Sequence, residues 1–146
     1  MGKYLKTAIG SIEDVKHVLE QSDVKSENNL TGGFYLLNRL LNSKTEDIVL
    51  NSIVAGANQI TENILNVNIH VPNLPGVTAG TPNTLDNTQP NTIRMETIGR
   101  SVLEILDGYR GFDFFLEIIS PGEVIPDGKN WYYNIVIKYF FLRRDN

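Results

Sequence analysis

The stretch that decides the fold is Ile64-Leu65-Asn66-Val67-Asn68-Ile69-His70-Val71, in which apolar and polar side chains alternate from Leu65 onward. Successive side chains of a β-strand point to opposite faces of the sheet. A period of two therefore places the apolar side chains on one face and Asn66, Asn68 and His70 on the other. The pattern predicts a half-buried strand over 64–71 whose asparagines and histidine face a polar surface or an interface.

The segments around this strand predict six further elements. They are a helix over 11–21, strands over 34–41 and 47–54, a helix over 92–107, and strands over 112–119 and 131–142. Ser11, with Asp14 three residues on, is the expected N-cap of the first helix. Asn91 or Thr92 should begin the second helix and Gly108 should end it. Residues 22–33 read as a loop and 55–61 as a turn.

The element order is therefore α-β-β-β-α-β-β. Strands grouped around helices, without strict βαβ alternation, indicate an α+β fold with a mainly antiparallel sheet. The last strand carries large apolar residues on both faces, which is typical of a central strand covered on each side. At 146 residues, we expect a single domain spanning 1–146.

Composition excludes several classes of function. The chain has no cysteine, so disulfides, thiolate metal sites and a thiol nucleophile are ruled out. Its net charge of −4 argues against nucleic-acid binding through phosphates. No apolar run approaches the roughly 20 residues of a membrane span, and no secretion signal is evident. We therefore expect a protein made in a reducing cytoplasm.

Residues 73–91 form a long connection rich in Pro, Gly, Asn and Thr. A connection of this length is either functional or a disordered connector. We expect an interaction arm, and its candidate interface residues are Leu74, Val77, Thr81 and Leu85. Arg143 and Arg144, at the end of the chain, are further interface candidates.

The sequence carries no recognisable catalytic motif. The two histidines, His17 and His70, have no partners at metal-ligand or catalytic-triad spacing. Glu46-Asp47 could in principle act as an acid–base pair, but a charged strand edge is the simpler interpretation. Asp127-Gly128 reads as a hairpin turn and not as the start of a calcium loop. We predict a protein that is not an enzyme, with no catalytic, cofactor-binding or metal-binding residues and no cofactor.

Three stretches together carry a family resemblance. They are Asn42-Ser43-Lys44-Thr45-Glu46-Asp47-Ile48-Val49-Leu50-Asn51-Ser52, Leu65-Asn66-Val67-Asn68-Ile69-His70-Val71-Pro72-Asn73, and the block from Arg94 to Tyr132-Tyr133-Asn134-Ile135-Val136-Ile137. In this order the chain, over roughly residues 34–144, resembles the tail-terminator or tail-completion proteins of long-tailed bacteriophages and prophages, particularly those of Bacteroides-type hosts.

The resemblance implies a small α+β structural protein of the virion, assembled in the host cytoplasm. Such a protein forms a ring, commonly a hexamer, that caps the tail tube, ends its polymerisation and joins it to the head–tail connector. Its implied partners are copies of itself, the tube protein and the connector, with no membrane and no specific nucleic-acid binding. Two alternatives stay open at this stage: a neck or head-completion protein of the same virion, and a monomeric bacterial adaptor or binding module.

Overall fold

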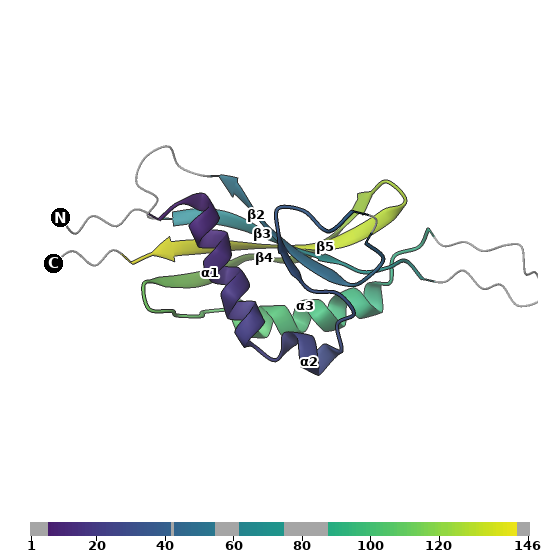
Figure 1. Cartoon of the computed structure of the whole chain (residues 1–146), viewed down its shortest axis with the longest axis horizontal. Helices are drawn as coiled ribbons and strands as arrows, with labels where there is room; N and C mark the ends of the chain where they lie inside the picture. Colours follow the sequence, from purple (N-terminus) through teal and green to yellow (C-terminus); the bar gives the residue numbers. More distant parts are fainter. Residues whose placement is uncertain (1–5, 42, 55–61, 75–87, 143–146) are drawn as a thin grey trace, which may run out of the picture.

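A five-stranded sheet with three helices makes up the structure, a computed structural model that describes residues 6–41, 43–54, 62–74 and 88–142 (Figure 1). The elements are α1 (Ala8–Gln21), α2 (Val24–Asn28), β1 (Phe34–Leu36), β2 (Asp47–Val54), β3 (Glu62–His70), α3 (Thr92–Leu106), β4 (Phe114–Asp127) and β5 (Asn130–Phe141). The strand order is β1-β2-β3-β5-β4, and only the β1–β2 pair is parallel. The predicted α+β class is confirmed.

The helices lie on one face of the sheet. α1 packs against β1, β2 and β3, and α3 packs against β3, β4 and β5 (Figure 1). The main core lies between this helical layer and the sheet face that it covers. The other face, called the open face below, carries no helix within the described residues.

Strand β3 has the predicted alternation. Leu65, Val67 and Ile69 are fully buried on the helical side, whereas the residues between them are only partly buried. In register, Val67 lies between Leu50 of β2 and Ile135 of β5. The central strands therefore share one apolar face, as a period of two requires.

The predicted start of the first helix was wrong. α1 begins at Ala8, and Thr7 is its N-cap, because the Thr7 hydroxyl accepts a hydrogen bond of 2.9 Å from the amide of Gly10. Ser11 is buried inside the helix, where it donates to the carbonyl of Ala8 and accepts from Asn63 of β3. The helix expected over 92–107, which is α3, begins as predicted, with the Asn91 side chain accepting a hydrogen bond from the amide of Arg94.

Two segments in the N-terminal half of the chain differ in secondary structure from what the sequence predicts. The loop expected over 22–33 contains the short helix α2, and the strand expected over 34–41 ends at Leu36. The chain leaves the sheet at Leu37, whose φ of 72° is left-handed and cannot continue a strand. Apolar composition alone did not reveal this turn. The turn expected over 55–61 lies outside the described residues.

β4 extends well beyond the end expected at residue 119, whereas β5 has the expected length. β4 continues through Pro121-Gly122 to Asp127, with irregular register between Ile118 and Glu123. An outer strand tolerates proline because one of its edges needs no ladder hydrogen bond. The hairpin turn predicted at Asp127-Gly128 is present, with a positive φ at Gly128.

The expectation that the last strand is covered on both faces was wrong. Residues of β5 on the helical side, such as Ile135 and Ile137, are fully buried, whereas those on the open face, such as Asn134 and Val136, are only partly buried. Within the described residues no helix covers the open-face side chains of β5, which explains why they are only partly buried.

Tyr133 of β5 fixes how α3 and β4 approach each other. A Cβ on Gly99 of α3 would lie 2.8 Å from the Tyr133 ring, and a Cβ on Gly122 of β4 would lie 1.9 Å from it. Gly122 also has a φ of 141°, a conformation that side-chain-bearing residues rarely adopt. The ring therefore lies between two glycines, neither of which has space for a side chain.

We predict that Gly122→Ala lowers the free energy of unfolding by roughly 3 kcal/mol, because it adds a steric clash to an unfavourable φ. Urea denaturation measures the change. Gly128→Ala is the matched control: its φ is also positive, at 63°, but the space around it is open. It should cost only about 1 kcal/mol. Equal losses in the two variants would contradict the role of Tyr133.

Candidate functional site

Four asparagines form a hydrogen-bonded cluster on the open face. Asn134 of β5 donates to the side-chain oxygens of Asn66 (2.9 Å) and Asn68 (2.7 Å), both on β3. Asn66 in turn donates to the side-chain oxygen of Asn51 on β2, at 2.7 Å. The amide nitrogens of Asn51 and Asn68 have no acceptor within the described residues. The cluster therefore offers hydrogen-bond donors without carrying charge.

His70 continues this face at the end of β3. It is paired in register with Asp47 of β2 and with Tyr132 of β5, and its ring centroid lies 5.2 Å from that of Tyr132. Burial lowers the pKa of His70 to about 4, and the charge of Arg39 adds to this effect. Asp127 and Asp47 act in the opposite direction but do not outweigh it. His70 is therefore neutral at pH 7.

A pocket of about 560 Å³ lies over these residues. Its lining includes His70, Asn68 and Asn51 from the sheet and Asp127 and Asn130 from the β4–β5 hairpin. The remaining wall comes from the segment between β1 and β2, which carries Leu37, Leu40 and Leu41 and is called the leucine loop below. The lining is mostly amides, an uncharged imidazole and leucines, with one residue of each charge, Arg39 and Asp127, so it suits contact with polypeptide better than binding of a highly charged ligand.

A buried carboxylate attaches the leucine loop to the sheet. Asp47, at 0% exposure, accepts hydrogen bonds from Arg39 (2.7 Å), Ser43 (2.5 Å) and Thr45 (2.8 Å). Arg39 also donates to the carbonyl of Thr45, at 2.7 Å. Burial alone would raise the pKa of Asp47, but the hydrogen bonds from Ser43, Arg39 and Thr45 outweigh burial and lower it.

A second ion pair joins the adjacent residue to α3. The two oxygens of Glu46 accept from Arg94 at 2.5 and 2.9 Å, a bidentate arrangement. Arg94 also donates to the carbonyl of Asn28 at the end of α2. The hydrogen bond to Glu46 raises the pKa of Arg94. The interpretation of Glu46-Asp47 as a charged strand edge was therefore wrong, because both carboxylates are buried and each is paired with an arginine.

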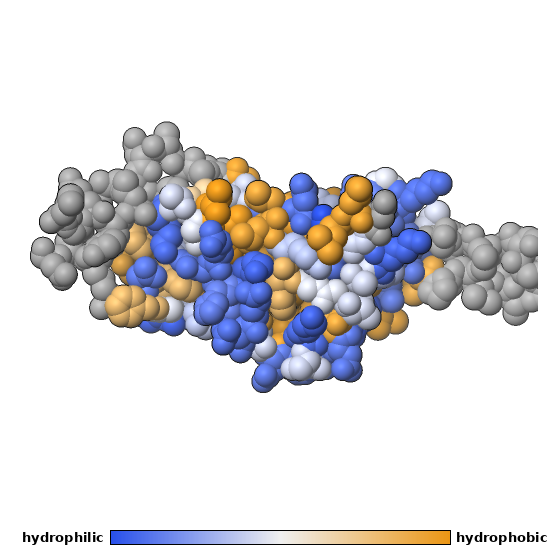
Figure 2. Space-filling model, in the orientation of Figure 1, coloured by the Kyte–Doolittle hydropathy of each residue, from blue (hydrophilic) through white to orange (hydrophobic). Residues whose placement is uncertain are grey.

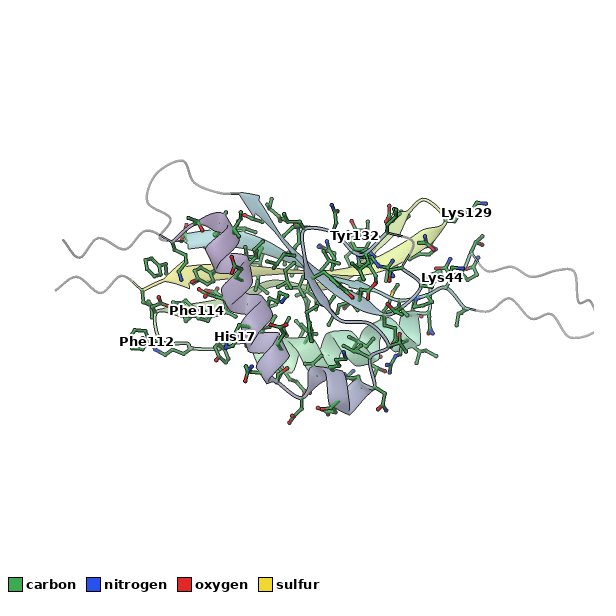
Figure 3. All side chains as sticks on the ribbon, viewed as in Figure 1. His17, Lys44, Phe112, Phe114, Lys129 and Tyr132 are labelled. Carbon is green, nitrogen blue, oxygen red and sulfur yellow. The ribbon has the colours of Figure 1, made fainter. Side chains whose placement is uncertain are left out.

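The structure brings together three of the candidate interface residues. Asn66, Asn68 and His70 lie in a row on the open face, and their role at an interface stays a prediction. Leu74 is exposed beyond the end of β3, where its amide donates to the carbonyl of Gln89. The other candidates lie outside the described residues; they are Val77, Thr81, Leu85, Arg143 and Arg144. His17 is exposed on α1 (Figure 3).

Sequence reasoning missed the partners of this row. Asn51 and Asn134 lie opposite Asn66 and Asn68 only because of the strand register. The available signal was that each is a polar residue on an apolar strand, but joining them required knowing the strand order. Arg39 was missed because it was expected within a strand.

The described residues contain no group of three His, Cys, Asp or Glu side chains that could hold a metal ion. No helix among them is long and apolar enough to cross a membrane. Comparison of the chain with protein-family models and with curated proteins gives no match.

We predict that acid destabilises the protein partly through His70. The unfolded chain takes up the imidazole proton near pH 6.5, whereas the folded chain does so near pH 4. Between these values the unfolded state binds more protons, so stability falls as the pH falls. The loss should be roughly 1–2 kcal/mol, less than full linkage gives, because the partly buried ring is screened by solvent.

Urea denaturation of the wild type and of His70→Gln, at pH 7 and pH 4, isolates this contribution. The variant should lose less stability than the wild type across the interval. NMR titration gives the pKa directly, and His17→Gln identifies which of the two imidazole signals belongs to His70. An ordinary histidine pKa for His70, with parallel stability profiles, would contradict the prediction.

Proposed function

We propose that the protein is a tail terminator of a long-tailed phage or prophage. Copies of it would form a ring that caps the tail tube, stops its polymerisation and joins it to the head connector. This proposal starts from the sequence resemblance over residues 34–144, and the α+β fold is compatible with it. The protein would act by shape, without catalysis, at the tail–head junction of the virion.

The main structural support is that the chain exposes apolar side chains at two different edges of its sheet. Beside β1, Leu40 and Leu41 are 64% and 91% exposed. Beside β4, Phe112 and Ile119 are 79% and 49% exposed. The first pair lies on the segment that borders the open-face pocket, and the second lies on or next to the outer strand β4, so the two apolar surfaces are distinct. In Figure 3, Lys44 from the leucine loop and Phe112 lie toward opposite ends of the molecule.

Two unlike surfaces on one chain favour head-to-tail assembly. When one patch of each subunit meets a different patch of the next, the assembly closes into a ring or extends as a filament. Exposed apolar patches on a small protein often mark such contacts. In Figure 2, apolar surface is visible over the segment that joins β1 and β2. Six subunits per ring is the number that the family resemblance implies.

The open face supplies a third surface for the proposed contacts along the tube axis. Its asparagine cluster and the neutral His70 can donate to and accept from the backbone of a partner. Because these side chains are uncharged, we expect this area to bind a protein surface and not the phosphates of DNA. We assign the tube protein or the connector as its partner.

Both ends of segment 75–87 are held beside the β4–β5 hairpin. The amide of Leu74 donates to the carbonyl of Gln89 at 3.0 Å, and the indole of Trp131 donates to the carbonyl of Thr88 at 2.7 Å. Asn73 donates to the carbonyl of Lys129, at 2.6 Å. Since the two ends are already together, a short linker can replace the segment without pulling the anchors apart.

We predict that purified protein added to polymerising tube subunits of the same phage gives capped tubes of limited length. Electron microscopy measures the lengths and the caps. Replacing residues 75–87 with Gly-Ser should leave the fold intact, by circular dichroism, but abolish capping. Normal capping by this variant would refute the interaction-arm role. Unrestrained tubes with the wild type, together with a single-chain mass, would favour a monomeric adaptor.

A further inference from the structure

The leucine loop presents an apolar side chain, Leu41, and an exposed lysine, Lys44, in the lining of one pocket. Leu41 is 91% exposed, so its side chain contacts little of its own subunit. Lys44, three residues on, is exposed and forms no ion pair within the described residues. The loop itself is held in place by Arg39 and Asp47. It therefore offers a fixed apolar projection with a positive charge beside it.

The opposite edge of the sheet carries a groove of about 360 Å³ between α3 and β4. Its lining is Leu103, Glu104, Asp107, Ile118 and Pro121. A cavity of roughly 150 Å³ already admits a benzene-sized group, so this groove can take a leucine side chain.

The rim of the groove is acidic. Glu104 and Asp107 are exposed and form no ion pair within the part of the chain that the structure describes. Arg100, one turn before Glu104, is paired with Glu96, and the charge of Glu104 acts on it only as a smaller contribution. The groove therefore combines an apolar floor with two carboxylates that are available to a cation.

We propose that the leucine loop of one subunit docks into the α3–β4 groove of the next copy of this chain. Leu41 would enter the groove, and Lys44 would lie beside Glu104 and Asp107. This inference rests on the proposed function, because it names the contact between neighbouring subunits that closes the ring.

The two surfaces match in both respects that matter for docking. An apolar projection meets an apolar floor, and a cation meets two carboxylates, so charge complementarity favours the contact. The two surfaces lie on opposite faces of the sheet: the leucine loop borders the open-face pocket, whereas the groove lies beside α3 on the helical face. Because the two surfaces are different, the contact is heterologous, as ring closure requires.

Introduced cysteines test this contact cleanly because the chain has none of its own. In the variant Leu41→Cys/Pro121→Cys, docking brings one cysteine of each type together across every subunit junction. Mild oxidation, alone and with tube subunits present, should give a ladder of covalent multimers on a non-reducing gel. The ladder should stop at the ring size. A disulfide within one subunit is excluded, because its two Cα atoms must lie within about 7 Å.

The matched control is Leu41→Cys/Glu13→Cys, which places the second cysteine at an exposed position on α1. It should cross-link at least tenfold more slowly. A mixture of the two single variants, Leu41→Cys and Pro121→Cys, should give mainly a two-chain product. Lys44→Glu should weaken assembly at least tenfold, and Lys44→Glu combined with Glu104→Lys should restore it.

The outcomes separate this inference from the proposed function. If Leu41→Cys/Pro121→Cys cross-links no faster than the control while the wild type still forms rings or caps tubes, the docking mode alone is overturned. A ladder in a protein that caps no tube would support the docking mode and refute the tail function. A wild type that neither assembles nor caps tubes, together with a Leu41→Cys/Pro121→Cys variant that does not cross-link, would refute both.

Discussion

The buried carboxylate of Asp47 is the constraint on which the rest of the surface depends. A charge removed from water is costly unless it is paired and hydrogen-bonded, and Arg39, Ser43 and Thr45 together supply those bonds. All three donors come from the segment between β1 and β2. The requirement to satisfy one carboxylate therefore fixes the leucine loop over the sheet. The wall of the open-face pocket and the position of Leu41 both follow from it.

The one-sided arrangement of the helices gives the two sheet faces different roles. The covered face builds the core, and the open face has to be acceptable to water or to a partner. Its asparagines suit both, because their side chains hydrogen-bond to one another across three strands while some of their amide N–H groups can still donate to a partner. The burial that keeps His70 uncharged extends the neutral surface. In the proposed ring, the two sheet edges would serve neighbouring subunits while the open face serves the tube or the connector.

Local pattern in the sequence was sufficient for the α+β class, for the alternation of β3 and for the cap of α3 at Asn91. It failed for residues whose burial depends on a partner elsewhere in the sequence. Glu46 is buried because Arg94, 48 residues away, neutralises it, and Asp47 because Arg39 folds back from a turn. No periodicity encodes such contacts. Only two members of the asparagine cluster could be predicted from the sequence. Asn66 and Asn68 alternate with apolar residues on β3, whereas Asn51 and Asn134 lie beside them only because of the strand register.

Amide hydrogen exchange in the leucine loop tests the central claim, that Asp47 and Arg39 hold this loop in one position. The amides of Leu37 and Ser43 donate to the carbonyls of Leu50 and Leu40. They should exchange at least about tenfold faster in Arg39→Ala than in the wild type, while the amides of β3 keep their protection. Equal exchange at Leu37 and Ser43 in the two proteins would contradict the account.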